Sequence, residues 1–236
     1  MATVLLLRHG RTSANADGTL AGRSAVALDE AGIAQATAAG ERLRGLPLRL
    51  VASSPLARCR QTVELALPGR EVLAEDGLIE CGYGEWEGRP LKQLARAPLW
   101  RVVQQHPSAV TFPGGESMSA MSARAVAAVR TLDDRVTAEH GPDALWLACS
   151  HGDVIKAIVA DALGLHLDLF QRVVVDPGSV TAIRYTPGRP FLARLNDAGG
   201  LASLVPARRP RRRRRRADED AVVGGGAGAA GTAGAG

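Results

Sequence analysis

The sequence predicts an α/β fold, a three-layer sandwich in which helices cover both faces of a mostly parallel sheet. Short apolar runs alternate with stretches of helical periodicity along most of the chain, and this alternation is typical of a parallel sheet. Of the 236 residues, 46% are hydrophobic and 22% are charged. That composition is ordinary for a globular protein and excludes a collagen-like or wholly disordered chain.

The first half of the chain supplies two strands and two helices. Residues 4–7 form a continuous apolar run, as in a strand buried on both faces. Residues 30–43 carry apolar side chains at helical spacing, before a glycine and a proline that end the helix. Residues 48–52 predict a second strand. A further helix should follow, with Ser54 as its capping residue and Pro55 at its first position.

The second half continues the alternation. Residues 118–136 carry one apolar helical face, and residues 144–150 read as a third strand. Residues 153–163 predict a helix that ends near a glycine. Residues 179–186 and 191–196 are joined by Pro-Gly and predict a closing hairpin.

The net charge of +5 is confined to the C-terminal tail. Residues 207–236 hold eight arginines, six of them consecutive, and three acidic residues, whereas residues 1–206 are neutral. We therefore expect a catalytic domain over 1–206 and a disordered tail over 207–236, arginine-rich and then Gly/Ala-rich. The basicity is no argument that the domain binds nucleic acid. The tail could contact phosphate backbones weakly and without sequence preference.

Targeting signals and cysteine usage predict a cytoplasmic protein without a membrane partner. No apolar run approaches the roughly 18 residues of a membrane helix, and no secretory leader opens the sequence. Cys59, Cys81 and Cys149 form no C-x-x-C pair and imply no disulfide framework. No apolar surface stripe separates from the core pattern, so the sequence leaves the oligomeric state open.

Charged residues follow each of the three predicted parallel strands. Arg8 and His9 follow the first, Arg58 lies just after the second, and His151 follows the third. Taken singly, each has an ordinary reading as a solvated or hydrogen-bonded residue. Because the carboxyl ends of parallel strands meet at one edge of a sheet, we expect them to converge there. Two guanidinium groups, two imidazoles and nearby helix N-termini suit a phosphate dianion.

Five motifs extend this interpretation to nearly the whole predicted domain. They are LLLRHGRTSAN, SSPLARCRQT, LIECGYGEWEG, FPGGES and SHGDVIKAIVADALGL. In order and spacing they resemble the histidine phosphatase superfamily, which contains phosphoglycerate mutase-like proteins and many small phosphatases. The likeness covers about residues 3–197.

The resemblance implies covalent phosphoryl transfer in two steps. His9 matches the nucleophile, which becomes a phosphohistidine. It must be neutral at the attacking nitrogen, so we expect a backbone carbonyl to hold the other ring nitrogen. Arg8, Arg58 and His151 match the phosphate pocket and would bind the phosphate oxygens through the transition state. Asn15 matches the asparagine of the same motif and would contact the phosphate less directly.

Glu80 matches the family's proton donor, which protonates the leaving oxygen and could later activate water. A carboxylate beside a phosphate should have a raised pKa because of like charge. Spacing alone leaves Glu85 and Glu87 as candidates, but Glu80 occupies the L-x-E position ahead of W-E-G. The S-S-x-x-x-R pattern likewise selects Arg58 over Arg60.

The implied chemistry requires no metal and no cofactor. The sequence contains no H-E-x-x-H, no aspartate cluster with metal-ligand spacing and no G-x-x-x-x-G-K-[ST] loop. No cysteine is followed by an arginine six positions later, as in a cysteine phosphatase. His106, His140 and His166 are predicted to be surface or packing residues.

These features predict a metal-independent phosphatase that hydrolyses small phosphomonoesters, with a small phosphorylated metabolite as its partner. A phosphomutase using the same His9 is the alternative, and a nucleic-acid-binding protein acting through its tail is a weaker one. Ala25 and Ala27 stand where the family typically has Asp and Pro, so the substrate does not carry over. Four basic residues in a short insertion could bind an anionic substrate or form a solvated helix face: Arg89, Lys92, Arg96 and Arg101.

Overall fold

The computed structural model describes residues 1–200 and Gly224, and in this part of the chain six strands form one sheet. The strands are β1 (Thr3–Arg8), β2 (Leu48–Ser53), β3 (Leu73–Ala74), β4 (Leu145–Ser150), β5 (Val180–Arg184) and β6 (Phe191–Asp197). Their order is β3-β2-β4-β1-β5-β6. The pairs β3–β2, β2–β4 and β4–β1 are parallel, whereas β5 is antiparallel to both β1 and β6. This confirms the predicted α/β class, the mostly parallel sheet and the closing hairpin.

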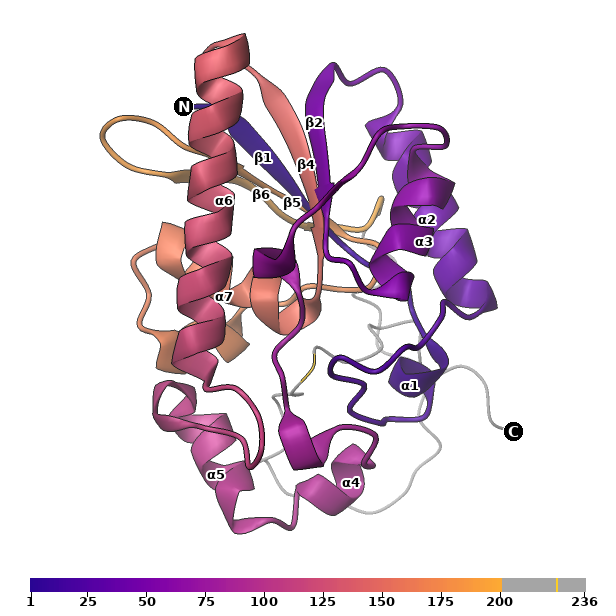
Figure 1. Cartoon of the computed structure of the whole chain (residues 1–236), viewed down its shortest axis with the longest axis vertical. Coiled ribbons are helices and arrows are strands. Elements are labelled where there is room, and N and C mark those ends of the chain that lie inside the picture. The colour runs from indigo at the N-terminus through magenta and orange to yellow at the C-terminus, as the bar shows by residue number, and fades with distance from the viewer. Residues whose placement is uncertain (201–223, 225–236) are drawn as a thin grey trace.

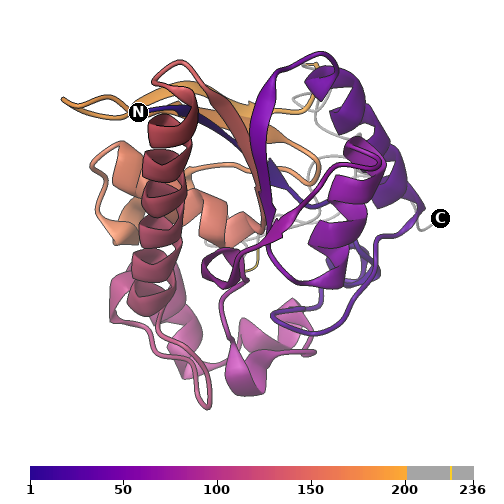
Figure 2. The same ribbon diagram turned by 45° about the horizontal axis from the view of Figure 1, so that its top comes forward.

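Helices cover both faces of this sheet. They are α1 (Ser13–Ala16), α2 (Glu30–Leu43), α3 (Ala57–Ala66), α4 (Leu91–Leu94), α5 (Pro98–Gln105), α6 (Met118–His140) and α7 (Gly152–Ala162). Short 3₁₀ helices lie at Asp76–Leu78, Gly84–Trp86, Pro107–Ala109 and Leu167–Arg172. Figures 1 and 2 show α2 and α3 on one face and α6 and α7 on the other, with α1, α4 and α5 beyond one end of the strands. The three predicted layers are therefore present.

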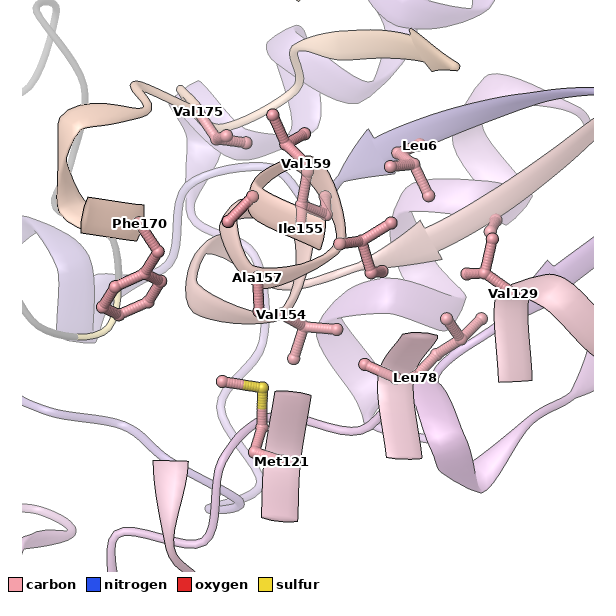
Figure 3. Close-up of a cluster of buried hydrophobic side chains, with 14 of the residues drawn as sticks. Leu6, Leu78, Met121, Val129, Val154, Ile155, Ala157, Val159, Phe170 and Val175 are labelled. Carbon is pink, nitrogen blue, oxygen red and sulfur yellow. The ribbon is translucent and has the colours of Figure 1, made fainter. Parts of the chain in front are cut away.

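The apolar runs alternate between two cores because successive strand residues point to opposite faces. Leu7 of β1 packs into the cluster beneath α2 and α3, together with Leu43. Leu6 points the other way and packs among residues of α6 and α7, including Val129 and Ile155 (Figure 3). Both cores bury their β1 residues almost completely, which is why residues 4–7 show no polar alternation.

Helix boundaries largely follow the sequence signals. The Asp29 side chain accepts a hydrogen bond from the Gly32 amide at 2.8 Å and starts α2. Ser117 caps α6 in the same way through the Ala120 amide at 3.0 Å, and Gly141 ends it with φ 87°. Helix α3 is an exception: it begins at Ala57, with Leu56 as its N-cap and without a side-chain cap. The prediction that Ser54 caps this helix, with Pro55 at its first position, was wrong.

Two further predictions concern the C-terminal tail and membrane-spanning helices. The tail over 207–236 lies outside the described residues except for Gly224, so its disorder and its nucleic-acid contact stay predictions. Among the helices that the structure describes, none has the length and apolar character needed to cross a bilayer.

Candidate active site

Three loops meet at the carboxyl edge of the sheet, as the parallel topology predicted. Strands β2, β4 and β1 are neighbours, so the loops that follow them emerge side by side. The rings of His9 and His151 meet edge to face, with centroids 5.1 Å apart. The Nε of Arg58, from α3, lies 3.3 Å from Nε2 of His9. Residues separated by up to 142 positions in sequence thus form one cluster.

His9 is held as a neutral imidazole with its lone pair on Nε2. Its side chain is buried, and Nδ1 lies 2.7 Å from the Gly10 carbonyl, to which it donates. That places the proton on Nδ1 and leaves Nε2 to accept from Arg58. Burial lowers the pKa of His9 well below its usual value, and the charges of Arg58 and Arg8 lower it further. The expected backbone carbonyl is therefore that of Gly10.

Glycine is required next to His9 because another backbone approaches closely. A Cβ built on Gly10 would lie 2.4 Å from the Gly32 carbonyl oxygen at the start of α2. The Gly10 amide also donates to the Thr62 hydroxyl at 3.0 Å. The R-H-G sequence thus places His9 between β1, α2 and α3.

Two buried arginines bring positive charge to the cluster. Arg8 ends β1 and donates to the Val175 carbonyl at 2.6 Å. Burial lowers the pKa of Arg8 to about 10, against the opposing effect of nearby carboxylates, so it stays charged at neutral pH. Arg58 donates to the carbonyls of Gly22 at 2.6 Å and Ser24 at 3.1 Å. Arg60 is exposed, and the structure places Arg58 rather than Arg60 beside His9.

His151 is the N-cap residue of α7 and is completely buried. Its Nε2 lies 2.8 Å from the hydroxyl of Ser54. Burial lowers the pKa of His151 well below its usual value, and the positive charge of Arg58 is the next largest cause of this lowering. The same hydroxyl accepts from the amide of Leu56, the N-cap residue of α3, at 3.4 Å, so it contacts both His151 and the backbone just before the helix. The local sequence around Ser54 predicted a helix cap and gave no sign of its contact with His151.

Glu80 is the acidic group of the site. It lies in the loop after the Asp76–Leu78 turn and is only 3% exposed. Burial and then the charge of Asp153 raise its pKa, which comes to about 7 against the opposing effects of Arg58, the Cys81 amide and Arg8. The raised pKa was expected from a bound phosphate. Here it arises from burial and from a carboxylate of the protein itself.

The alternative acids occupy other positions. Glu85 is exposed, and Glu87 accepts a hydrogen bond from the Tyr83 amide at 3.1 Å. Of the three candidates, Glu80 shares a pocket with His9 and Arg58. The geometry therefore agrees with the choice of Glu80.

Asn15 lies in the wall of the pocket and also has a structural task. Its side-chain oxygen accepts from the Thr12 amide at 3.1 Å and the Thr12 hydroxyl at 2.9 Å. The Thr12 side chain in turn accepts from the Asn15 amide, so the pair closes the first turn of α1. Asn15 thus shapes the loop that follows His9.

A buried polar group beside the site was missed by the sequence analysis. Asp153, in the first turn of α7, accepts from the Tyr83 hydroxyl at 2.8 Å and lies 3.8 Å from the Lys156 ammonium. All three side chains are buried. In the sequence, Asp153 and Lys156 are the D and K of S-H-G-D-V-I-K. The local pattern alone does not distinguish them from the solvated residues that often begin a helix.

Small and apolar residues line most of the pocket in front of His9. Besides His9, Arg58, Glu80 and Asn15, the described residues in its wall are Thr12, Ala14, Gly18, Thr19, Leu20, Ala21, Gly22, Leu91 and Gly224. Within this described lining, Arg58 is the one arginine or lysine. Lys92, Arg96 and Arg101 are exposed, and Arg89 is half-buried away from this lining. The predicted surface histidines have side-chain exposures of 67% (His106), 35% (His140) and 68% (His166). No group of three or more His, Cys, Asp or Glu that could hold a metal ion occurs among the described residues.

Comparison with known proteins places this arrangement in a family. The model of the histidine phosphatase superfamily (branch 1) matches residues 4–198. The chain is 31% identical to the bifunctional protein Rv2228c of Mycobacterium tuberculosis over 203 residues, 84% of this chain and 54% of that protein. It therefore spans about half the length of that relative.

Two further proteins match over most of their own length. A 2,3-bisphosphoglycerate-dependent phosphoglycerate mutase of Brucella melitensis is 30% identical over 216 residues, 85% of this chain and 96% of that protein. The crystal structure of the alpha-ribazole phosphatase from Shigella flexneri has a TM-score of 0.71 and 28% identity, covering 83% of this chain and 96% of that one. The sheet, the two-histidine cluster and these matches agree that the chain belongs to the histidine phosphatase superfamily.

Proposed function

We propose that the protein is a hydrolase of small phosphomonoesters that acts through a phosphohistidine on His9. The observation that carries this proposal is one pocket that joins a neutral His9 Nε2, a cationic Arg58 and a Glu80 with a pKa of about 7. A nucleophile, an anion-binding group and a proton donor are the three elements that phosphoryl transfer to histidine needs.

In the first step, the lone pair on His9 Nε2 attacks phosphorus and forms the P–N bond. The bond from phosphorus to the leaving oxygen breaks as Glu80 gives that oxygen its proton. Arg8, Arg58 and His151 bind the phosphate oxygens, whose charge must be held in the transition state. The hydrogen bond from Nδ1 to the Gly10 carbonyl stabilises the positive charge that develops on the ring.

In the second step, water attacks phosphorus and the P–N bond breaks. Glu80, now a carboxylate, accepts a proton from the water, and the electron pair of the P–N bond returns to Nε2. The products are inorganic phosphate, neutral His9 and protonated Glu80. A carboxyl group with a pKa near neutrality suits both the acid and the base role.

The lining of the pocket favours hydrolysis of esters whose leaving group carries no second anionic group. In a phosphoglycerate mutase, the molecule that accepts the phosphoryl group carries a phosphate or carboxylate of its own, and the enzyme must bind that second anionic group. Within the described lining, Arg58 is the single guanidinium or ammonium group, and its Nε lies 3.3 Å from His9 Nε2. Nearby Arg23 is paired with Glu116, and Arg11 with Asp29. The remaining wall suits a neutral or apolar leaving group.

A phosphomutase is the second candidate, because the Brucella relative is a phosphoglycerate mutase by name. It would use the same first step, with a substrate hydroxyl in place of water in the second. The two activities differ in their product. A hydrolase releases inorganic phosphate, whereas a mutase interconverts phosphoglycerates and depends on a bisphosphate primer.

The experiment measures phosphate release from a panel of small monoesters with EDTA present, for wild type, His9→Ala and the control His166→Ala. Monoesters with an uncharged leaving group should be hydrolysed by wild type and by the control but not by His9→Ala. An alkali-stable, acid-labile phosphoenzyme should form in the first two alone. Hydrolysis retained by His9→Ala would overturn the nucleophile, and primer-dependent interconversion of phosphoglycerates would replace the hydrolase with the mutase.

A further inference from the structure

Glu80 lies on a segment that is itself part of no strand or α-helix. The segment runs from the Asp76–Leu78 turn to Gly82, so its carbonyl groups do not belong to the hydrogen-bond ladder of the sheet. An acid that must give its proton to one particular oxygen needs a fixed backbone, since small displacements weaken proton transfer.

Side chains from a helix and from a strand bind the carbonyl groups of this segment. Arg124 of α6 donates to the carbonyls of Gly77 at 2.8 Å, Ile79 at 2.7 Å and Glu80 at 3.1 Å. Ser150, at the end of β4, donates to the Leu78 carbonyl at 2.7 Å. Four successive carbonyls, from residue 77 to residue 80, are therefore bound by side chains.

Glu116, in the F-P-G-G-E-S motif, fixes the guanidinium of Arg124. The two side chains form a bidentate pair, with Nε–Oε1 at 2.7 Å and Nη2–Oε2 at 2.9 Å. Glu116 also accepts from the Gly82 amide at 3.2 Å, two residues after Glu80. Burial alone would raise the pKa of Glu116, but hydrogen bonds and charge from Arg124 outweigh it and lower the pKa. The carboxylate therefore stays ionised and keeps the guanidinium in plane.

Arg23 connects this assembly to the phosphate pocket. It donates to the Glu80 carbonyl at 3.0 Å and to Glu116 at 3.0 Å. Its neighbours Gly22 and Ser24 accept from Arg58. The loop of residues 22–24 thus contacts the group beside His9 on one side and the backbone of Glu80 on the other.

We infer that Arg124, held by Glu116, is a positioning residue that sets Glu80 against the leaving oxygen. The inference rests on the proposed role of Glu80 as proton donor. A planar group with five donors can bind three carbonyls and a carboxylate at once, whereas a lysine ammonium has three donors on a flexible stem. This requirement for geometry gives the F-P-G-G-E-S motif and the second turn of α6 a function at a pocket whose described wall includes neither.

The test compares two substrates of nearly the same size, phenyl phosphate and p-nitrophenyl phosphate. Phenolate needs a proton to leave, whereas nitrophenolate leaves readily without one. The kcat/KM of each is measured for the full chain as wild type, Glu80→Gln, Arg124→Gln, Arg124→Lys, Glu116→Gln and Arg130→Gln. Arg130 is the matched control: it lies on the same helix and is paired with Asp161 on the surface.

Glu80→Gln should lower kcat/KM for phenyl phosphate by about 10²–10⁴-fold, with a smaller effect on p-nitrophenyl phosphate. Arg124→Gln should reproduce this split with a loss of about 10-fold or more on phenyl phosphate, part of the effect of the acid itself. Arg124→Lys and Glu116→Gln should show the split in weaker form, and Arg130→Gln should not show it.

Each outcome bears on a separate statement. Equal losses on both substrates in the Arg124 and Glu116 variants, or no loss, would overturn the positioning role while leaving Glu80 as the acid. If Arg124→Gln does not fold, as judged by circular dichroism and thermal unfolding, the split in Arg124→Lys and Glu116→Gln decides. Absence of the split in Glu80→Gln, or no hydrolysis by wild type, would overturn the proposed function itself and this inference with it.

Discussion

Raising the pH above neutrality should remove the proton that Glu80 donates, and the loss can be worked out from its surroundings. Burial and the charge of Asp153 bring the pKa of Glu80 to about 7. At about pH 9 roughly 1% of Glu80 is protonated, so kcat/KM for an ester that needs the acid should fall by about 100-fold. His9 does not obscure this limb, because its pKa lies well below its usual value and the ring is already neutral.

The assay measures kcat/KM between about pH 6 and 9.5 for phenyl phosphate and p-nitrophenyl phosphate. This parameter reports the steps up to departure of the leaving group. Phenyl phosphate should show the alkaline limb, and p-nitrophenyl phosphate should show a flatter profile. Glu80→Gln should lack the limb with either substrate. A limb near pH 7 that persists in Glu80→Gln, or a phenyl phosphate profile that is flat to pH 9, would refute the reasoning.

Asp153→Asn tests the cause of the shift. The carboxylate of Asp153 disfavours a second negative charge on Glu80, so its removal should lower the pKa of Glu80. The alkaline limb for phenyl phosphate should then move to lower pH, while the amide can still accept from the Tyr83 hydroxyl. A limb that stays in place would show that the charge of Asp153 does not raise the pKa of Glu80.

Two stability predictions follow from packing. Gly10→Ala would bring a Cβ to 2.4 Å from the Gly32 carbonyl oxygen. We expect a loss of about 1–3 kcal/mol in the free energy of unfolding, together with reduced activity. The control Gly188→Ala, with open space around it, should not change stability, and equal midpoints for the two variants in thermal unfolding would contradict the argument. Ile155→Ala empties a fully buried site and should cost about 2–5 kcal/mol; Ile33→Ala, at a residue 46% exposed, should stay within about 0.5 kcal/mol in denaturant titrations.

The convergence of His9, Arg58 and His151 was predictable because it needs little information. Apolar runs locate the strands, and parallel pairing brings the loops that follow them to one edge. The order β2-β4-β1 then makes the three loops neighbours. The identity of the acid came from resemblance rather than from spacing, which left Glu85 and Glu87 open.

The sequence could not predict features that depend on distant partners. Ser54 followed by proline has the local pattern of a helix cap, but its partner, His151, lies 97 positions away. The pKa of Glu80 depends on Asp153, which reaches the site through packing of α7. Local rules describe neither contact, since both arise only when separate elements pack together.

The nucleophile and the acid differ in how their backbones are protected from local opening. Strand β1 is paired on both sides, by β4 and β5, so its amide hydrogens should exchange with solvent only when the whole domain unfolds. The segment before Glu80 is held by side chains and can open at a lower free-energy cost. On gentle heating, the two reactions should therefore be lost at different temperatures. Hydrolysis that depends on proton donation should decline first, whereas phosphorylation of His9 by an activated ester should persist until global unfolding.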